Sequence, residues 1–266
     1  MKAQKLITAI EELAPLNLAW ERDVVGIQVG SSQQDIHRVM TTLDVRPEVV
    51  AEAIEKHVDF IFSHHPLMFH AAKNLDLEDP QNQMYADLLK NNITVYSAHT
   101  NLDAAKDGMN DWLAEALGIK NTKPLLPDKG DPNSGLGRIG ELDHPISVQK
   151  YAQSIRELFN VKAVRVIAND LKRSIQKIAV IGGDGGSEYL VAQQSGADAL
   201  ITADLYYHTG HDVLSHDFIV IDSDHHMESI VKDQMVKQIK RWQQTKKWDL
   251  VDVFSSQVNT DPYTYI

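Results

Sequence analysis

The chain has 266 residues, of which 43% are hydrophobic, so it can form one large domain or two smaller lobes with a hydrophobic core. Its formal net charge of -11 argues against a general nucleic-acid binder, because phosphate contacts need clustered Lys and Arg. The absence of cysteine excludes disulfides, thiolate metal ligands and a cysteine nucleophile, and it is compatible with the cytoplasmic location that we expect.

Residues 1–20 show an amphipathic pattern that contains Glu11 and Glu12, which predicts a helix and not a signal peptide. No apolar run approaches the roughly 18–20 residues of a membrane span, so we expect no membrane partner. Further along the first half, apolar and β-branched runs predict strands at 37–45, 58–65 and 93–100. Helical spacing predicts helices at 46–57, 83–92 and 108–118.

The segment 123–137 is rich in Pro, Gly and Asp, and we interpret it as the joint between two lobes, at about 1–123 and 133–266. In the second half the pattern predicts helices at 147–159, 187–196 and 227–245 and strands at 162–168, 176–186, 197–208 and 217–226. Strands that alternate with helices of this length indicate an α/β fold with parallel sheet. The stretch 48–65 is faintly similar to 188–207, which fits either a duplicated lobe or a chance likeness of two βαβ units.

Histidine and carboxylate side chains gather at the ends of the predicted strands, where open parallel sheets bind their ligands. They are His64, His65, His99, Asp103, Asp204, His208, Asp222, Asp224, His225, His226 and Glu228. Taken singly, each has an ordinary explanation as a surface histidine, a turn residue or a helix cap. Taken together, the pattern predicts a metal site.

The spacing of these residues selects among them. Adjacent residues at a strand end diverge, so His64 and His65 could reach two different ions. His225 and Glu228 are spaced i, i+3 and share a helix face, whereas His226 does not share it with Glu228. Histidine nitrogen and carboxylate oxygen without sulfur suit Zn, Fe, Mn, Co or Ni, and Glu228 can bridge two ions.

The glycine-rich stretch GGDGGS, residues 182–187, lies between a predicted strand and a predicted helix. Its backbone amides could hold a phosphate, although it lacks the Lys-Ser/Thr of a P-loop and does not fit GxGxxG. A tight turn between strand and helix explains the same glycines, and both alternatives stay open.

The chain resembles the NGG-interacting factor three (Nif-three-like) family of dinuclear-metal proteins, whose bacterial members are commonly labelled GTP cyclohydrolase I type 2 homologs. The resemblance runs over nearly the whole chain. In order, its motifs are LAWERDVVGIQVG (18–30), TLDV (42–45), SHHPLMF (63–69), SAHTNLD (97–103), GLGRIGEL (135–142), IGGDGGS (181–187), ITADLYYH (201–208), DSDHHMES (222–229) and TDPY (260–263).

The resemblance implies two similar α/β lobes, a site for two divalent metal ions per subunit in the cleft between them, and a toroidal homohexamer. The ligands it implies are His64, His65, Asp103, His225 and Glu228, with His99 as an additional ligand or as the catalytic acid/base. The implied function is a dinuclear metal-dependent hydrolase, similar to GTP cyclohydrolase type 2, in which metal-activated water attacks a small, nucleotide-like substrate. A non-enzymatic metal-binding or scaffold protein is the alternative.

Three features depart from the family pattern, and the smallest is Ala203 in place of the glycine of the family's Thr-Gly-Asp. Asp224 stands where the family usually has glycine, and aspartate enters left-handed backbone more readily than most residues. The domain that some relatives carry in the middle of the chain is replaced by the short segment near 123–137.

Overall fold

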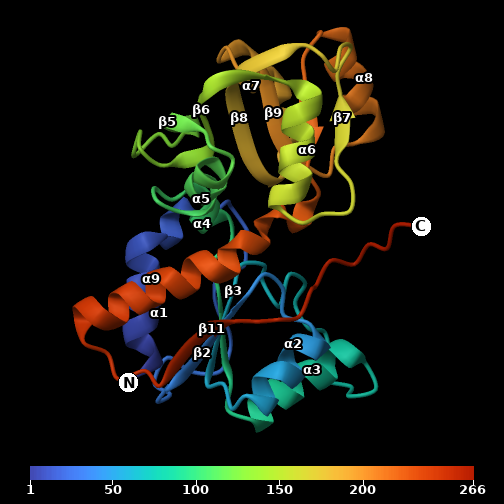
Figure 1. Cartoon of the computed structure of the whole chain (residues 1–266). Coiled ribbons are helices and arrows are strands. Elements are labelled where there is room, and N and C mark those ends of the chain that lie inside the picture. Colours follow the sequence, from blue (N-terminus) through green and yellow to red (C-terminus); the bar gives the residue numbers. More distant parts are fainter. The chain divides into compact units, whose positions relative to one another are not determined.

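The computed structural model describes residues 1–266, and the chain divides into two compact units. Unit 1 comprises residues 1–102 and 231–262, and unit 2 comprises residues 103–230 and 263–266. Each unit is built around one β-sheet (Figure 1). None of the helices has both the length and the apolar composition needed to cross a membrane.

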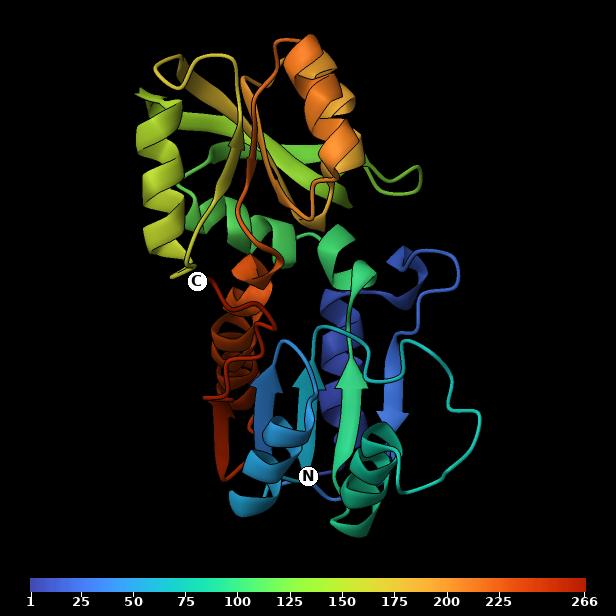
Figure 2. The same cartoon turned by 90° about the vertical axis from the view of Figure 1, so that its right-hand side faces the viewer.

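The sheet of unit 1 has the strand order β1-β4-β3-β2-β11. Its strands are β1 (Gly26–Val29), β2 (Arg38–Thr42), β3 (Phe60–Ser63), β4 (Thr94–Ser97) and β11 (Asp252–Ser255). The four strands from β4 to β11 are parallel, and β1 pairs with β4 in the antiparallel sense. The carboxyl ends of the parallel strands therefore meet at one edge of the sheet, and Figure 2 shows the strands of this sheet side by side.

Helices cover both faces of this sheet, so its strands are buried on both sides. On one face, α2 (Pro47–Glu55) and α3 (Pro80–Lys90) pack against Met40, Ile61 and Val95. On the other lie α1 (Ala3–Leu13) and α9 (Ile230–Lys246), and Tyr96 of β4 donates a hydrogen bond to Glu11 of α1. The short helix α4 (Thr100–Ala104) follows β4.

The sheet of unit 2 has the strand order β5-β6-β8-β9-β10-β7. Its strands are β5 (Lys120–Pro127), β6 (Gly135–Ser147), β7 (Arg165–Ile167), β8 (Ser174–Asp184), β9 (Ala199–Ala203) and β10 (Val220–Asp222). Strands β8, β9 and β10 are parallel to one another, and the remaining pairs are antiparallel. The α/β class predicted from the sequence is thus confirmed, with two mixed sheets.

Alternation along β8 assigns the helices of unit 2 to opposite faces of its sheet. Ala179 and Ile181 belong to a core with α7 (Tyr189–Gln194) and α8 (Tyr207–Ser215). Gly182, one residue further along, faces the other side, where a Cβ atom on it would lie 3.0 Å from Leu113 of α5 (Met109–Ala116). Helix α6 (Val148–Leu158) lies on the α5 side, as Figure 2 shows, and Tyr151 of α6 donates a hydrogen bond to the Leu117 carbonyl beside α5.

The Pro- and Gly-rich segment 123–137 is not a joint between lobes. It forms most of the β5–β6 hairpin, and only residues 128–134 are irregular. Buried Arg138 ties this hairpin to α5 by an ion pair with Asp111 and hydrogen bonds to carbonyl groups. The division into units consequently differs from the limits of about 1–123 and 133–266 expected for the lobes.

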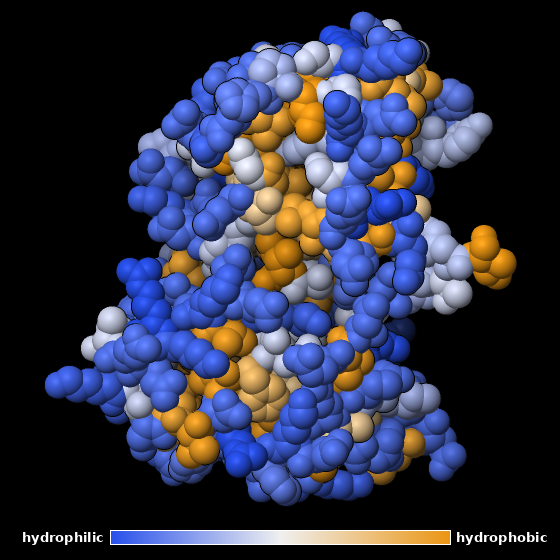
Figure 3. All heavy atoms as spheres, viewed as in Figure 1, coloured by the Kyte–Doolittle hydropathy of each residue, from blue (hydrophilic) through white to orange (hydrophobic).

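Other elements also differ from the sequence-based expectation. The strand predicted at 197–208 ends at Ala203, because Asp204 has a φ of 52° and helix α8 begins at Tyr207. Strands β1 and β11 were not predicted. They form the two edges of the sheet of unit 1, and fewer of their residues are buried than in β3 and β4, so their apolar pattern is weaker. On the face shown in Figure 3 hydrophilic residues predominate, with smaller hydrophobic patches among them.

Candidate metal-binding residues

Three histidines of unit 1 meet at the carboxyl ends of two neighbouring parallel strands. His64 and His65 follow β3 directly, and His99 follows β4 by two residues. The register that pairs Ser63 with Ser97 brings the two strand ends level. One potential ligand atom of each histidine lies within 4.8 Å of those of the other two. The parallel register therefore brings together nitrogen donors that follow two strands distant in sequence.

The Nδ1 atom of each of these histidines has an oxygen acceptor. His64 Nδ1 lies 2.9 Å from the Ala98 carbonyl, and His65 Nδ1 lies 2.7 Å from the Asp44 carboxylate. His99 Nδ1 lies 3.0 Å from the Asp23 carboxylate. An acceptor oxygen fixes the ring proton on Nδ1 and leaves the lone pair on Nε2, which is the form in which imidazole binds a metal ion.

The two carboxylates that orient His65 and His99 are themselves held in place. Asp23 accepts hydrogen bonds from the backbone and hydroxyl groups of Thr100. Burial raises the pKa of Asp23, but the hydrogen bonds from His99 and Thr100 outweigh it, and the pKa lies well below its ordinary value. Asp44 also accepts a hydrogen bond from the Thr260 hydroxyl, so its orientation toward His65 is fixed from a distant part of unit 1.

In unit 2, His225 and Glu228 lie together in the 3-10 helix His225–Ser229, which follows β10. His225 Nε2 is 3.1 Å from Glu228 Oε2, and His225 Nδ1 is 2.6 Å from the carboxylate of Asp204. Two donors that each lie about 2.0–2.1 Å from a tetrahedral metal ion are about 3.3 Å apart. The spacing of His225 and Glu228 thus fits a shared ion, and Asp204 orients the histidine as Asp44 orients His65.

The glycines of the GGDGGS stretch make room for this pair. A Cβ atom on Gly182 would lie 2.8 Å from Glu228 Oε1, and one on Gly183 would lie 3.2 Å from His225 Nε2. Gly183 also has a φ of 61°, a conformation that L side chains rarely adopt. The backbone amide of Gly185 donates to Thr202. These contacts give the stretch a structural reason that requires no bound phosphate.

Asp224, which precedes the pair, has a φ of 72°, so the position does require a left-handed residue. Its side chain accepts a hydrogen bond from the backbone amide of His226 and so caps the 3-10 helix. Aspartate therefore preserves the backbone that glycine allows here. Tyr265 donates a further hydrogen bond of 2.9 Å to Asp224.

Asp103 is buried in unit 2 and lies near Glu228, with potential ligand oxygens of the two residues within 4.8 Å of each other. Asn110 of α5 links this position to the glycine stretch. Its amide nitrogen donates to the Asp103 carbonyl at 3.0 Å, and its amide oxygen accepts from the Gly182 amide at 2.9 Å. The Asp103 backbone and the glycine stretch beside Glu228 are thus held by one buried side chain.

Further acidic groups surround His225 in unit 2. Asp204, Asp222 and Asp224 line a cavity of about 320 Å³ together with His225. Burial, followed by the negative charge of Asp204, raises the pKa of nearby Asp184. Arg165 lines the same cavity and pairs with Asp222, so the negative charge that favours a cation there comes from Asp204 and Asp224.

The structure thus groups the predicted residues within each unit. His64, His65 and His99 lie together in unit 1, and Asp103, His225 and Glu228 lie together in unit 2. The rings of His64 and His65 do not diverge strongly, because their centroids are only 5.2 Å apart.

Other residues from the same predicted strand ends have different surroundings. His208 lies on α8, where its ring packs against Tyr207, and Asp222 forms an ion pair with Arg165. Asp23 and Asp44 were not predicted as site residues. They lie in the motifs LAWERDVVGIQVG and TLDV, which supported the family resemblance but gave no role for either aspartate.

Comparisons with a family model, with known sequences and with solved structures all point to one family. The model of the family Duf34/NIF3 (NGG1p interacting factor 3) matches residues 1–262. The GTP cyclohydrolase 1 type 2 homolog of Streptococcus pneumoniae is 39% identical, with 100% of both chains covered. The homolog of that name from Bacillus subtilis is 28% identical, and the match covers 100% of this chain and 99% of the relative. The crystal structure of a Bacillus cereus protein related to NIF3 matches with a TM-score of 0.95 at 26% identity, covering 100% of this chain and 99% of that one.

Proposed function

Because the chain belongs to the Duf34/NIF3 family, we propose that it is a hydrolase that depends on two divalent metal ions per subunit. The proposed ligands are His64, His65, Asp103, His225 and Glu228. The observation that carries the proposal is the arrangement of the histidines. Each has an oxygen acceptor at Nδ1, which directs Nε2 to a metal ion.

The donor set supports a transition metal. It consists of imidazole nitrogens and carboxylate oxygens, which suit Zn, Fe, Mn, Co or Ni better than Ca or Cu(I). Glu228 is the candidate for a bridging ligand, because its carboxylate has two oxygens and one of them already lies 3.1 Å from His225. The absence of cysteine makes the donor set independent of thiol oxidation.

His99 is the proposed acid/base. When bound, the metal ions would supply Lewis acidity and lower the pKa of a coordinated water to about 7. Asp23 holds His99 with its proton on Nδ1 at 3.0 Å, so Nε2 can accept a proton from water or deliver one to a leaving group. The retained charge of Asp23 would stabilise the imidazolium that forms.

The curated relatives are named GTP cyclohydrolase 1 type 2 homologs, and on this basis we propose a nucleotide-like substrate. A cyclohydrolase would attack a carbon of the guanine ring, whereas a phosphoester or amide hydrolase would use the same residues on another electrophile. A toroidal homohexamer is the proposed assembly, and size-exclusion chromatography with light scattering tests it.

The test of the function is turnover of GTP, with a panel of phosphoesters and amides in parallel, by wild-type protein loaded with each candidate metal. His99→Asn should reduce turnover at least 100-fold and keep the bound metal, as expected for loss of a general acid/base. His144→Asn changes an exposed histidine on β6 and should leave turnover unchanged.

Metal that binds without turnover of any compound would contradict the hydrolase. That outcome would favour metal storage, metal delivery or a scaffold role for the same ligands.

A further inference from the structure

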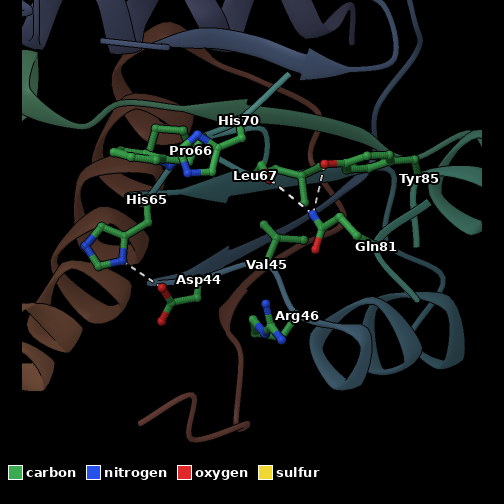
Figure 4. A pocket seen from close by; sticks show the side chains of 10 residues that line it. Asp44, Val45, Arg46, His65, Pro66, Leu67, His70, Gln81 and Tyr85 are labelled. Carbon is green, nitrogen blue, oxygen red and sulfur yellow. Dashed lines mark hydrogen bonds and ion pairs between the residues drawn. The ribbon is translucent and has the colours of Figure 1, made fainter. Parts of the chain in front are cut away.

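Unit 1 contains a cavity of about 360 Å³ beside His65, close to the lower end of the range of about 300–1,000 Å³ for small-molecule pockets. Figure 4 shows the side chains that line it, which come from the segments after β2 and β3 and from α3. Its lining residues are Asp44, Val45, Arg46, His65, Pro66, Leu67, Phe69, His70, Gln81 and Tyr85. The proposed metal ligand His65 is therefore also part of the wall of a preformed pocket.

Arg46 supplies a positive charge to this cavity. It is exposed, it lies at the N-cap of α2, and its guanidinium forms no ion pair or side-chain hydrogen bond. The neighbouring Asp44 is directed elsewhere, to His65 and Thr260. A planar guanidinium with all its donors available binds phosphate or carboxylate groups in a bidentate manner.

Gln81 supplies an oriented acceptor. Its amide nitrogen donates to the Leu67 carbonyl at 3.3 Å and to the Tyr85 hydroxyl at 2.9 Å, as the dashed lines in Figure 4 show. These two bonds fix which way the amide points. The amide oxygen accepts no hydrogen bond from the protein and can take one from a ring N–H.

Phe69 supplies an aromatic surface. Its side chain is 63% exposed although it is large and apolar, and it lines the cavity. The ring of His70 packs against it edge to face, with centroids 5.3 Å apart. An aromatic ring held in this way offers a stacking surface to a planar ligand.

We propose that this cavity is the substrate pocket of the hydrolase and binds a planar heterocycle that carries both a ring N–H and an anionic group. Arg46 pairs with the anion, Gln81 accepts the ring N–H, and Phe69 stacks on the ring. His65 in the same wall sets the bound ring beside a metal ligand. This inference rests on the proposed function, and it adds the residues and the substrate chemistry that give recognition.

The probe is GMP, which has a ring N–H and a phosphate, and its binding to metal-loaded protein is measured by titration calorimetry. Arg46→Gln should weaken GMP binding about tenfold or more, because it removes a charge-assisted contact. Phe69→Leu should weaken it about two- to tenfold through the lost stacking. Arg241→Gln changes an exposed arginine on α9 and serves as the matched control, with an unchanged Kd.

Guanosine and inorganic phosphate separate the two contacts. Guanosine should bind equally to wild type and Arg46→Gln, and phosphate should bind equally to wild type and Phe69→Leu. Circular dichroism melts of each variant establish that it is folded. The proposal is overturned if wild type does not bind GMP, or if Arg46→Gln and Phe69→Leu both bind GMP as wild type does.

Metal content and turnover of the same samples keep this result apart from the proposed function. If Arg46→Gln loses GMP binding but wild type turns over no compound, the proposed pocket is supported and the proposed hydrolase activity is contradicted. If wild type turns over a substrate and both variants have an unchanged KM for it, the hydrolase activity is supported and the proposed pocket is contradicted.

Discussion

The ends of the two sheets present potential metal ligands and their neighbours in different ways. In unit 1, three histidines project from the ends of buried parallel strands, and carboxylate or carbonyl groups fix their rings. In unit 2, the donors His225 and Glu228 lie in a 3-10 helix that closes against the glycines at the end of β8. Unit 1 thus supplies nitrogen from rigid strands, and unit 2 supplies mainly carboxylate from a tight turn.

The potential ligands of the two units are held in position by different kinds of interaction. The histidines of unit 1 depend on hydrogen bonds that determine which ring nitrogen is available. The pair in unit 2 depends on backbone that only glycine or a left-handed residue can adopt, at Gly183 and Asp224. Substitutions can therefore be chosen that damage one kind of support and leave the other intact.

Loss of a ligand should have the largest effect. His64→Ala removes a buried nitrogen donor of unit 1, and we expect metal affinity to fall by more than about 100-fold, the upper end for residues that only orient a ligand. Competition with a chelator of known affinity measures the change. Retention of wild-type affinity in this variant would exclude His64 as a ligand.

Loss of an orienting carboxylate should have the next largest effect. Asp204→Ala removes the group 2.6 Å from His225 Nδ1, and metal affinity should fall about 10- to 100-fold. Asp44→Ala should act on His65 to a similar degree. Asp143→Ala, at an exposed carboxylate of the β5–β6 hairpin, is the control and should leave affinity unchanged.

The support by glycine is tested by Gly183→Ala. The left-handed backbone should cost about 1–2 kcal/mol of unfolding free energy, and the added Cβ would press on His225 and Glu228 and lower metal affinity. Gly196→Ala is a matched control, because Gly196 has a φ of 79° but lies beside Lys177. Urea unfolding should show similar destabilisation in both, whereas metal affinity should fall only in Gly183→Ala.

The smallest effect is expected for Asp224→Gly. Glycine accepts the φ of 72° without strain, and it loses the cap to His226, which costs a few tenths of a kcal/mol. Stability should stay within about 0.5 kcal/mol of wild type in thermal unfolding. A loss of several kcal/mol would mean that the carboxylate, and not the backbone, is what this position requires.

The sequence predicted the parts of the fold that local pattern determines. His64, His65 and His99 were placed at strand ends because apolar runs precede them, and the His225–Glu228 pair followed from its spacing. The β5–β6 hairpin was missed because Pro and Gly suggested irregular chain, whereas pairing with β8 and the Arg138–Asp111 ion pair stabilise it. That contact joins residues 27 apart in sequence.

The residues that orient the histidines could not be predicted either, because they contact residues far away in sequence. Asp23 meets His99 across 76 residues, and Thr260 meets Asp44 across 216 residues. No local periodicity reports such pairs, because they arise only when the sheet brings distant segments together. Asp23 and Asp44 are present in the family motifs, but only the structure shows that they contact the Nδ1 atoms of His99 and His65.

Metal content per chain, by elemental analysis of wild type and Glu228→Ala, tests the central claim most directly. The proposal predicts about two ions in wild type and a sharp fall in the variant, because Glu228 is the candidate bridging ligand. Absence of metal from wild type after loading with each candidate metal, or full occupancy in Glu228→Ala, would contradict it.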